Sequence, residues 1–166
     1  VEVKLLDNLT VDMNLGDFKM GGEISITGTA EKPSYTGEIR VNEGYINYLD
    51  RKFEITKGNF YNYDPYKMDP LLDLEAVTEI DMISPAAKGQ LQTIESDTIY
   101  LTIRGRMSEP EVRLWAKDMP LDEGNIISIL TLGQPLGAVG EDLGERLKIF
   151  AQQSIIGFGT RKLEQL

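Results

Sequence analysis

Apolar and polar residues alternate along most of this chain, and the alternation limits its fold more than any other feature. Successive side chains of a β-strand point to opposite faces, so an alternating segment has one face to bury and one to expose. The pattern predicts a mainly β domain with at least five short strands before residue 60 and further strands after Pro70. The alternating segments are residues 9–15, 24–26, 39–41, 46–48, 53–55, 72–80, 99–103 and 112–114.

Turn signals separate several of these segments. Gly28 is followed by Pro33, and Gly105 is followed by Pro110 at the same spacing. Glycine permits a bend, and proline, which lacks a ladder donor, suits the first residue of the next strand. Each pair therefore predicts a strand, a turn and a strand. Residues 84–96 show no periodicity and are rich in small and polar types, which predicts a mobile loop or an insertion.

Gly44 leaves one strand register open. Ile39 and Val41 precede it, Ile46 and Tyr48 follow it, and the whole segment reads as strand, turn, strand. A glycine inside such a run can reset the alternation. The sequence alone therefore does not decide whether Ile46 and Tyr48 lie on the same wall as Ile39 and Val41.

Two helices are expected near the C-terminal end of the sequence. Asp122 can cap a helix that is apolar nearly all round, and Gly133 is placed to end it. Such a helix should be buried. A second helix is expected from about Glu141 to about Gly157, with Leu143 and its helical neighbours forming an apolar stripe.

Charge and missing residue types exclude several functions. The net charge of −10 repels phosphate backbones, so no nucleic acid partner is expected. The chain has no histidine and no cysteine, which removes the commonest general base, the commonest metal ligand and any thiolate site. We therefore expect no metal, no cofactor and no enzymatic activity. No apolar run reaches the roughly 18 residues of a membrane span, and the first residues, VEVKLLDN, read as the cut end of a longer protein.

A row of acidic residues is the first candidate for a chemical site. Asp73, Glu75, Glu79 and Asp81 alternate along one predicted strand, and carboxylates of this kind bind calcium or act as paired acid and base. Carboxylates two residues apart on a strand stand about 6.6 Å apart in a row, however, and do not converge on one point. The pattern favours a solvated outer face.

The second candidate is the loop at residues 61–70, which crowds three tyrosines with Asp64 and Asp69. This composition suits a sugar-stacking or calcium site, and a turn between strands explains the Asp-Pro pairs equally well. An enzyme that acts on cell-wall sugars through Asp64, Asp69 or the row beginning at Asp73 is the remaining catalytic hypothesis.

The apolar faces of the strands have two interpretations that periodicity does not separate. One is the ordinary dry core of a sandwich or a closed barrel. The other is a sheet that curls into an open trough, so that its lining is a surface for a ligand.

Several segments, in their order and spacing, resemble the C-terminal domain of TamB, the inner-membrane subunit of the translocation and assembly module. No single motif is specific, and the resemblance covers roughly residues 20–157, with residues 84–96 departing from it. The segments are residues 33–39, Asn42-Glu43-Gly44, residues 53–60, Asp69-Pro70-Leu71-Leu72, the strand at Ile103, Ser108-Glu109-Pro110, residues 111–115 and residues 122–133.

This resemblance implies a curled, U-shaped (taco-like) β-sheet with an apolar interior over residues 1–118. Residues 119–166 would form a helical segment packed on or beside the trough, within a single structural domain. It also implies a periplasmic location, in a protein anchored in the inner membrane by an N-terminal helix absent from this sequence. The implied partners are phospholipid acyl chains and a TamA-like outer-membrane barrel protein.

The first hypothesis is a conduit that carries acyl chains between the inner and outer membranes and supports outer-membrane assembly. Exposing an acyl chain to water costs roughly 0.8 kcal/mol per CH₂, and an apolar trough removes most of that barrier. The alternative is a docking or chaperone module that pairs by β-augmentation with a TamA-like barrel or nascent outer-membrane proteins. An exposed edge also predicts self-association of the isolated fragment. The predicted lining is Ile24, Ile26, Ile39, Val41, Phe53, Ile55, Leu72, Leu74, Leu101, Ile103, Val112 and Leu114.

Overall fold

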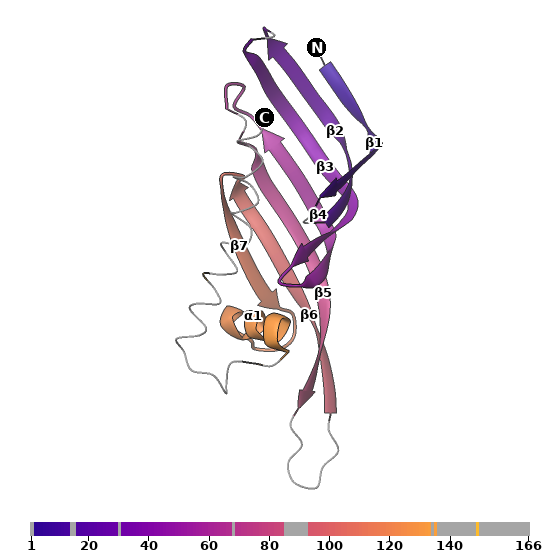
Figure 1. Ribbon diagram of the computed structural model, residues 1–166, viewed down its shortest axis with the longest axis vertical. Helices are drawn as coiled ribbons and strands as arrows, with labels where there is room; N and C mark the ends of the chain where they lie inside the picture. The colour runs from indigo at the N-terminus through magenta and orange to yellow at the C-terminus, as the bar shows by residue number, and fades with distance from the viewer. Residues whose placement is uncertain are drawn as a thin grey trace.

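The computed structural model describes residues 2–13, 16–29, 31–67, 69–84 and 93–133, together with residues 135 and 149. The strands of this part of the chain form a single antiparallel sheet in sequence order (Figure 1). They are β1 (Glu2–Met13), β2 (Gly16–Gly28), β3 (Pro33–Tyr48), β4 (Arg51–Asn62), β5 (Leu71–Ser84), β6 (Thr93–Arg106) and β7 (Glu109–Ala116), and the helix α1 (Glu123–Leu132) follows them.

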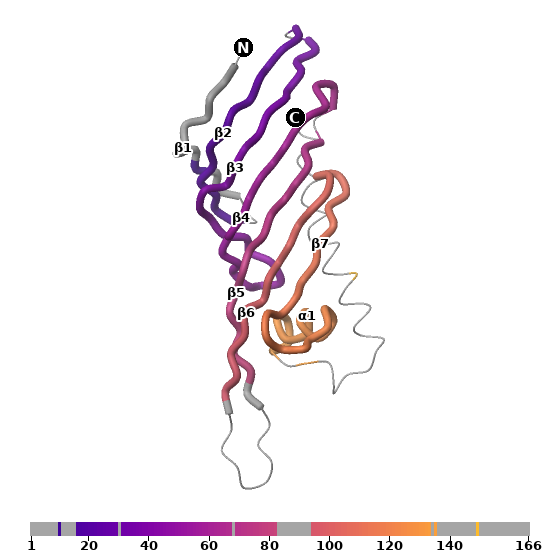
Figure 2. The backbone as a smooth tube through the Cα atoms, turned by 180° about the vertical axis from the view of Figure 1, so that it is seen from behind, coloured from indigo at the N-terminus to yellow at the C-terminus, as the bar shows by residue number. Residues whose placement is uncertain are grey.

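The sheet is open, with β1 and β7 at its two edges. Each strand pairs only with its neighbours in sequence among the described residues, so the sheet does not close into a barrel. The β5–β6 hairpin extends beyond the other strands at one end of the long, twisted sheet (Figures 1 and 2). The predicted mainly β fold is therefore confirmed and a closed barrel is excluded, whereas the U-shaped curl stays a prediction.

The two glycine–proline signals mark hairpin ends as predicted. Gly28 pairs with Pro33 at the end of β2 and β3, and Gly105 pairs with Pro110 at the end of β6 and β7. The φ angles of these glycines are 87° and 98°, in the region that glycine adopts most easily. Pro33 is the first residue of β3 and Pro110 is the second residue of β7, positions near a strand end where proline is tolerated.

The segment around Gly44 is one continuous strand, so the predicted division of β3 into two strands is wrong. Gly44 has φ 155° and lies inside the β2–β3 ladder, opposite Phe18. A Cβ atom added to Gly44 would lie 2.4 Å from the carbonyl oxygen of Asp17. The glycine is thus required by the close approach of β2 and not by a turn.

The predicted loop at residues 84–96 is shorter than the sequence indicates. The β5–β6 ladder continues through Ile80↔Asp97 and Met82↔Glu95 to Ser84↔Thr93. This end of the hairpin lacks apolar alternation because it projects from the sheet and is exposed on both faces. Periodicity alone therefore does not identify it as strand.

The first predicted helix is confirmed with both of its caps. The Asp122 side chain accepts a hydrogen bond from the Asn125 N–H at 3.0 Å, and Gly133 ends α1 with φ 75° and donates to the Ile129 carbonyl at 2.9 Å. These contacts satisfy groups that every helix end leaves unpaired. The second predicted helix, from about Glu141, lies outside the described residues.

Candidate functional site: one apolar face of the open sheet

The strand register places every predicted lining residue on one face of the sheet. Cross-strand partners in an antiparallel sheet lie on the same face. Ile39 pairs with Phe60, and Phe60 pairs with Leu72 on the next strand. Leu74 pairs in turn with Ile103. We call this side of the sheet the apolar face; its use by a ligand stays a prediction.

Two β-bulges keep the apolar face continuous along β3 and β4. The β2–β3 register shifts at Asn42, and the β4–β5 register shifts at Thr56, so each strand holds an extra residue there. An extra residue reverses the alternation of a strand. Ile46 therefore pairs with Phe53 on the apolar face, with Tyr48 further along it. This geometry settles the register that the sequence left open.

Burial divides the apolar face into two zones. Phe53 is 0% exposed and Leu101 is 1% exposed, and the predicted lining residues on β5, β6 and β7 are buried as well. The side chains of Ile24, Ile26, Ile39 and Ile55 are only half-buried. We call the residues of this second group the half-buried zone; it lies on β2, β3 and β4.

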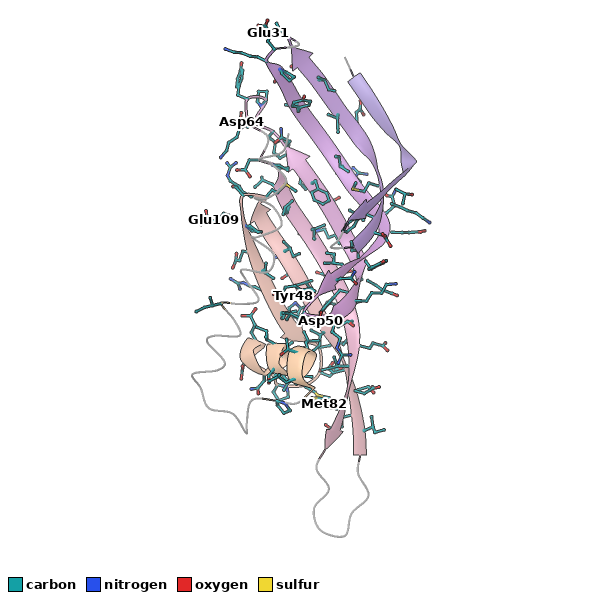
Figure 3. All side chains as sticks on the ribbon, viewed as in Figure 1. Glu31, Tyr48, Asp50, Asp64, Met82 and Glu109 are labelled. Atoms are coloured by element: carbon teal, nitrogen blue, oxygen red, sulfur yellow. The ribbon has the colours of Figure 1, made fainter. Side chains whose placement is uncertain are left out.

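The helix α1 lies at one end of the sheet, near Tyr48 (Figure 3). Its Ile126 and Ile127 are 0% and 1% exposed, and they belong to the same hydrophobic cluster as Phe53 and Leu101. The prediction that this helix is buried is confirmed. Because α1 packs against the apolar face, Phe53 and Leu101 are core residues in this conformation and do not offer their side chains to a ligand.

Several residues of the apolar face are absent from the predicted lining. Phe18 and Met20 alternate with Asp17 and Lys19, so their alternation is visible in the sequence. Phe60 could be placed only by the ladder, and Ile46 and Tyr48 only by the register beyond the bulge. Ala76, Ile80 and Ile99 lie in segments whose alternation the sequence shows, and they too lie on the apolar face although the predicted lining omits them.

The opposite face of the sheet carries ion pairs. Asp73 accepts from the Lys57 Nζ at 2.5 Å and from the Arg104 Nε at 3.2 Å. The hydrogen bond from Lys57 is the main cause that lowers the pKa of Asp73. In the acidic row, the Asp81 carboxylate accepts from Ser96 at 2.6 Å. In the described ranges, no group of three or more acidic residues could hold a metal ion. Glu79 and Asp81 of the acidic row are exposed, whereas Asp73 and Glu75 are half-buried.

The loop at residues 61–70 has its own structural explanation. Asp69 is 7% exposed and accepts hydrogen bonds from the N–H and the hydroxyl of Ser108, both at 2.9 Å. Burial alone would raise the pKa of Asp69, but the hydrogen bonds from Ser108 and Lys67 outweigh it and the pKa is lowered. Asp64 accepts from the Tyr66 N–H at 2.9 Å within the turn. Asp69 therefore links this loop to the turn between β6 and β7, and Asp64 stabilises its own turn.

These observations define a class of protein: an open antiparallel sheet with one apolar face, one charged face and a short helix packed at one end. Among the described helical residues, none forms a helix with the length and apolar character that crossing a bilayer requires. Such a scaffold offers a surface and two strand edges, and the carboxylates of Asp69 and Asp73 are used in structural contacts.

The family model described as TamB C-terminal domain matches residues 1–166, so the chain belongs to this family. Membership indicates a TamB-related role in outer-membrane assembly, within the translocation and assembly module. The resemblance seen in the sequence is thereby confirmed over the whole chain. A search of curated proteins finds no match.

Proposed function

We propose that this domain carries phospholipid acyl chains along its apolar face as part of a non-enzymatic, periplasmic route between the inner and outer membranes. The observation that supports this proposal best is the continuity of the apolar face across strands β2 to β7. On β2 to β7, the described charged residues that share this face are Arg51, Glu95 and Asp97, which lie near strand ends and away from the half-buried zone.

The half-buried zone is the part of the face best suited to an acyl chain. Its side chains keep exposed apolar surface, and covering such surface is favourable by about 25 cal/mol per Å². Dispersion contacts with branched side chains are weak one by one and lack direction, so a chain can slide along them. Phe53 and Leu101 contribute by holding α1 and the sheet together.

Photo-crosslinking from two adjacent positions tests the proposal. Ile39 lies on the apolar face, whereas Arg40 lies on the charged face and is exposed. A photoreactive residue at position 39 should give phospholipid adducts in cells, and the same residue at position 40 should not. Equal lipid labelling from both positions, or none from position 39, would overturn the proposal.

A charge in the half-buried zone should block the route without unfolding the domain. Ile39→Arg keeps the side chain within reach of water, because Ile39 is only half-buried. We expect a soluble, folded variant that fails to complement a strain lacking this protein, with Arg40→Ile as the matched variant that still complements. Full activity of a folded Ile39→Arg protein would contradict the conduit.

A second function, pairing with a strand of an outer-membrane protein, is favoured by the two edges of the open sheet. Edge strands present unpaired backbone groups, and β-augmentation uses them. We propose a TamA-like barrel or a nascent outer-membrane protein as the partner, and the same edges would let isolated copies of this domain associate. A proline on an edge strand should abolish such binding while leaving lipid adducts unchanged.

A further inference from the structure

The backbone of β7 has one side that faces β6 and one side that faces away from the sheet. The Lys117 N–H donates to the Thr98 carbonyl at 3.0 Å, which continues the β6–β7 register. Backbone groups in an antiparallel strand alternate in direction. Odd-numbered residues of β7 therefore face β6, and even-numbered residues such as Pro110 and Leu114 face the edge.

Two of these edge positions lack a donor that a new strand could use. Pro110 has no N–H. The N–H of Leu114 donates to the Oε1 atom of Glu123 at 3.0 Å. The Glu123 carboxylate oxygen thus occupies the place that the carbonyl oxygen of an added strand would take.

The contact comes from α1, which lies against β7 (Figure 1). The connection between β7 and α1 is fixed by Asp97, whose carboxylate accepts from the N–H groups of Asp118 and Met119 at 3.1 and 2.8 Å. The hydroxyl of the nearby buried Tyr48 has no hydrogen-bond partner within the part of the chain that the structure describes. The Glu123 carboxylate is directed at the strand edge and accepts from the Leu114 N–H, not from the Tyr48 hydroxyl. Burial, and then the charge of Glu123, raises the pKa of the Tyr48 phenol.

We propose that α1 guards the β7 edge, and that an extended strand of a partner protein binds there only when Glu123 leaves the Leu114 N–H. This inference rests on the proposed strand-pairing function and adds its regulation. A partner strand would supply a carbonyl oxygen in place of the carboxylate and would continue the sheet beyond β7.

Substitutions at Glu123 separate the hydrogen bond from charge and size. Glu123→Gln keeps the length of the side chain and an acceptor oxygen. Glu123→Asp keeps the charge and loses reach, and Glu123→Ala loses both. Amide hydrogen exchange at Leu114 should be faster in the Ala and Asp variants than in the wild type and the Gln variant.

Strand binding is measured with a synthetic peptide that copies residues 97–106 of this chain, DTIYLTIRGR. Main-chain pairing tolerates many sequences, so this alternating peptide is a fair probe. Trp115 is the only tryptophan, it lies on β7 and it is 44% exposed, so its fluorescence reports binding at this edge. The control is the same peptide with proline in place of the residue that copies Leu101.

We expect the peptide to bind the Ala and Asp variants on the order of threefold to tenfold more tightly than the wild type, the effect of one hydrogen bond. The Gln variant should match the wild type. Thermal melts of each variant check folding. If the Ala variant is unfolded, the comparison of peptide affinity between the Asp variant and the wild type is the test.

The outcomes separate the guard from the pairing function on which it rests. Equal peptide affinity for all variants, reported by Trp115, would overturn the guard and leave strand pairing in place. Faster exchange at Leu114 without binding to any variant would overturn strand pairing at β7, and the partner proposed for this edge with it.

Discussion

At the scale of single residues, buried carboxylates join segments that are far apart in the sequence. Asp69 holds the loop before β5 to the turn between β6 and β7 through Ser108. Asp97 does the same for the connection between β7 and α1. Both residues look like surface acids in the sequence, and their partners become visible only when the hairpins are folded.

Asp69→Ala should lower the free energy of unfolding by about 1 to 3 kcal/mol, because it removes two charge-assisted hydrogen bonds between a buried carboxylate and Ser108. Chemical denaturation measures the change, and Glu109→Gln on the exposed side of the same turn is the control. The pKa of Asp69 is lowered in the folded state. Its contribution should therefore be complete above the unfolded pKa of about 3.9 and be lost as the pH falls through the lower folded value.

Equal stability of Asp69→Ala and Glu109→Gln would show that the hydrogen bonds between Asp69 and Ser108 do not stabilise the fold. A difference between the two variants that did not shrink in acid would show that the charge of Asp69 is not involved. Asp69→Asn should lie between the two, because its amide oxygen can still accept one hydrogen bond.

At the scale of elements, β3 and β4 show how two bulges preserve one apolar face. Without the extra residues at Asn42 and Thr56, Ile46 and Phe53 would point to the charged side. Gly44 lies just beyond the first bulge, where β2 approaches too closely for a side chain. The glycine and the bulge belong to the same local distortion of the sheet.

Gly44→Ala should destabilise the domain by about 3 kcal/mol or more, because the new methyl group meets the backbone of β2 and something must shift. Gly133→Ala is the control, since a Cβ atom there meets nothing within 4 Å. Its cost should be roughly 1 kcal/mol, from the left-handed backbone alone. Thermal unfolding of both variants gives the comparison, and equal costs would show that β2 does not crowd Gly44.

At the scale of the whole molecule, the sheet has a tightly packed end and a half-buried end. The packed end contains α1, Phe53 and Leu101, and the half-buried end contains Ile24 and Ile39. Stability and the proposed lipid route are thus assigned to different parts of one face, although the sequence presents all these residues in the same alternating pattern.

Leu101→Ala should lower the free energy of unfolding by about 2 to 5 kcal/mol, as expected for a cavity in a packed core. Ile24→Ala should cost about 1 kcal/mol, because less apolar area is removed from a buried site. In denaturant unfolding, Leu101→Ala should lower stability more than Ile24→Ala does. In lipid crosslinking, Ile24→Ala should reduce the yield of lipid adducts more than Leu101→Ala does. The reverse order would contradict the division into two zones.

The sequence by itself determined the local features of this protein. Alternation predicted the mainly β fold and the buried faces of β5, β6 and β7, and cap residues predicted α1 with both its ends. These features depend on neighbours in the chain, through the period of two in a strand and the unpaired groups of a helix end.

Only the tertiary structure decided which residues meet. β3 continues through Gly44, so that Ile46 and Tyr48 lie on the apolar face. Glu123 lies at the edge of β7, where it accepts from the Leu114 N–H. Such contacts depend on register and on where a helix packs, and a shift of one residue reverses them without changing composition or periodicity. The division of the apolar face into a packed end and a half-buried end was decided in the same way, because the described helix α1 packs at one end of it.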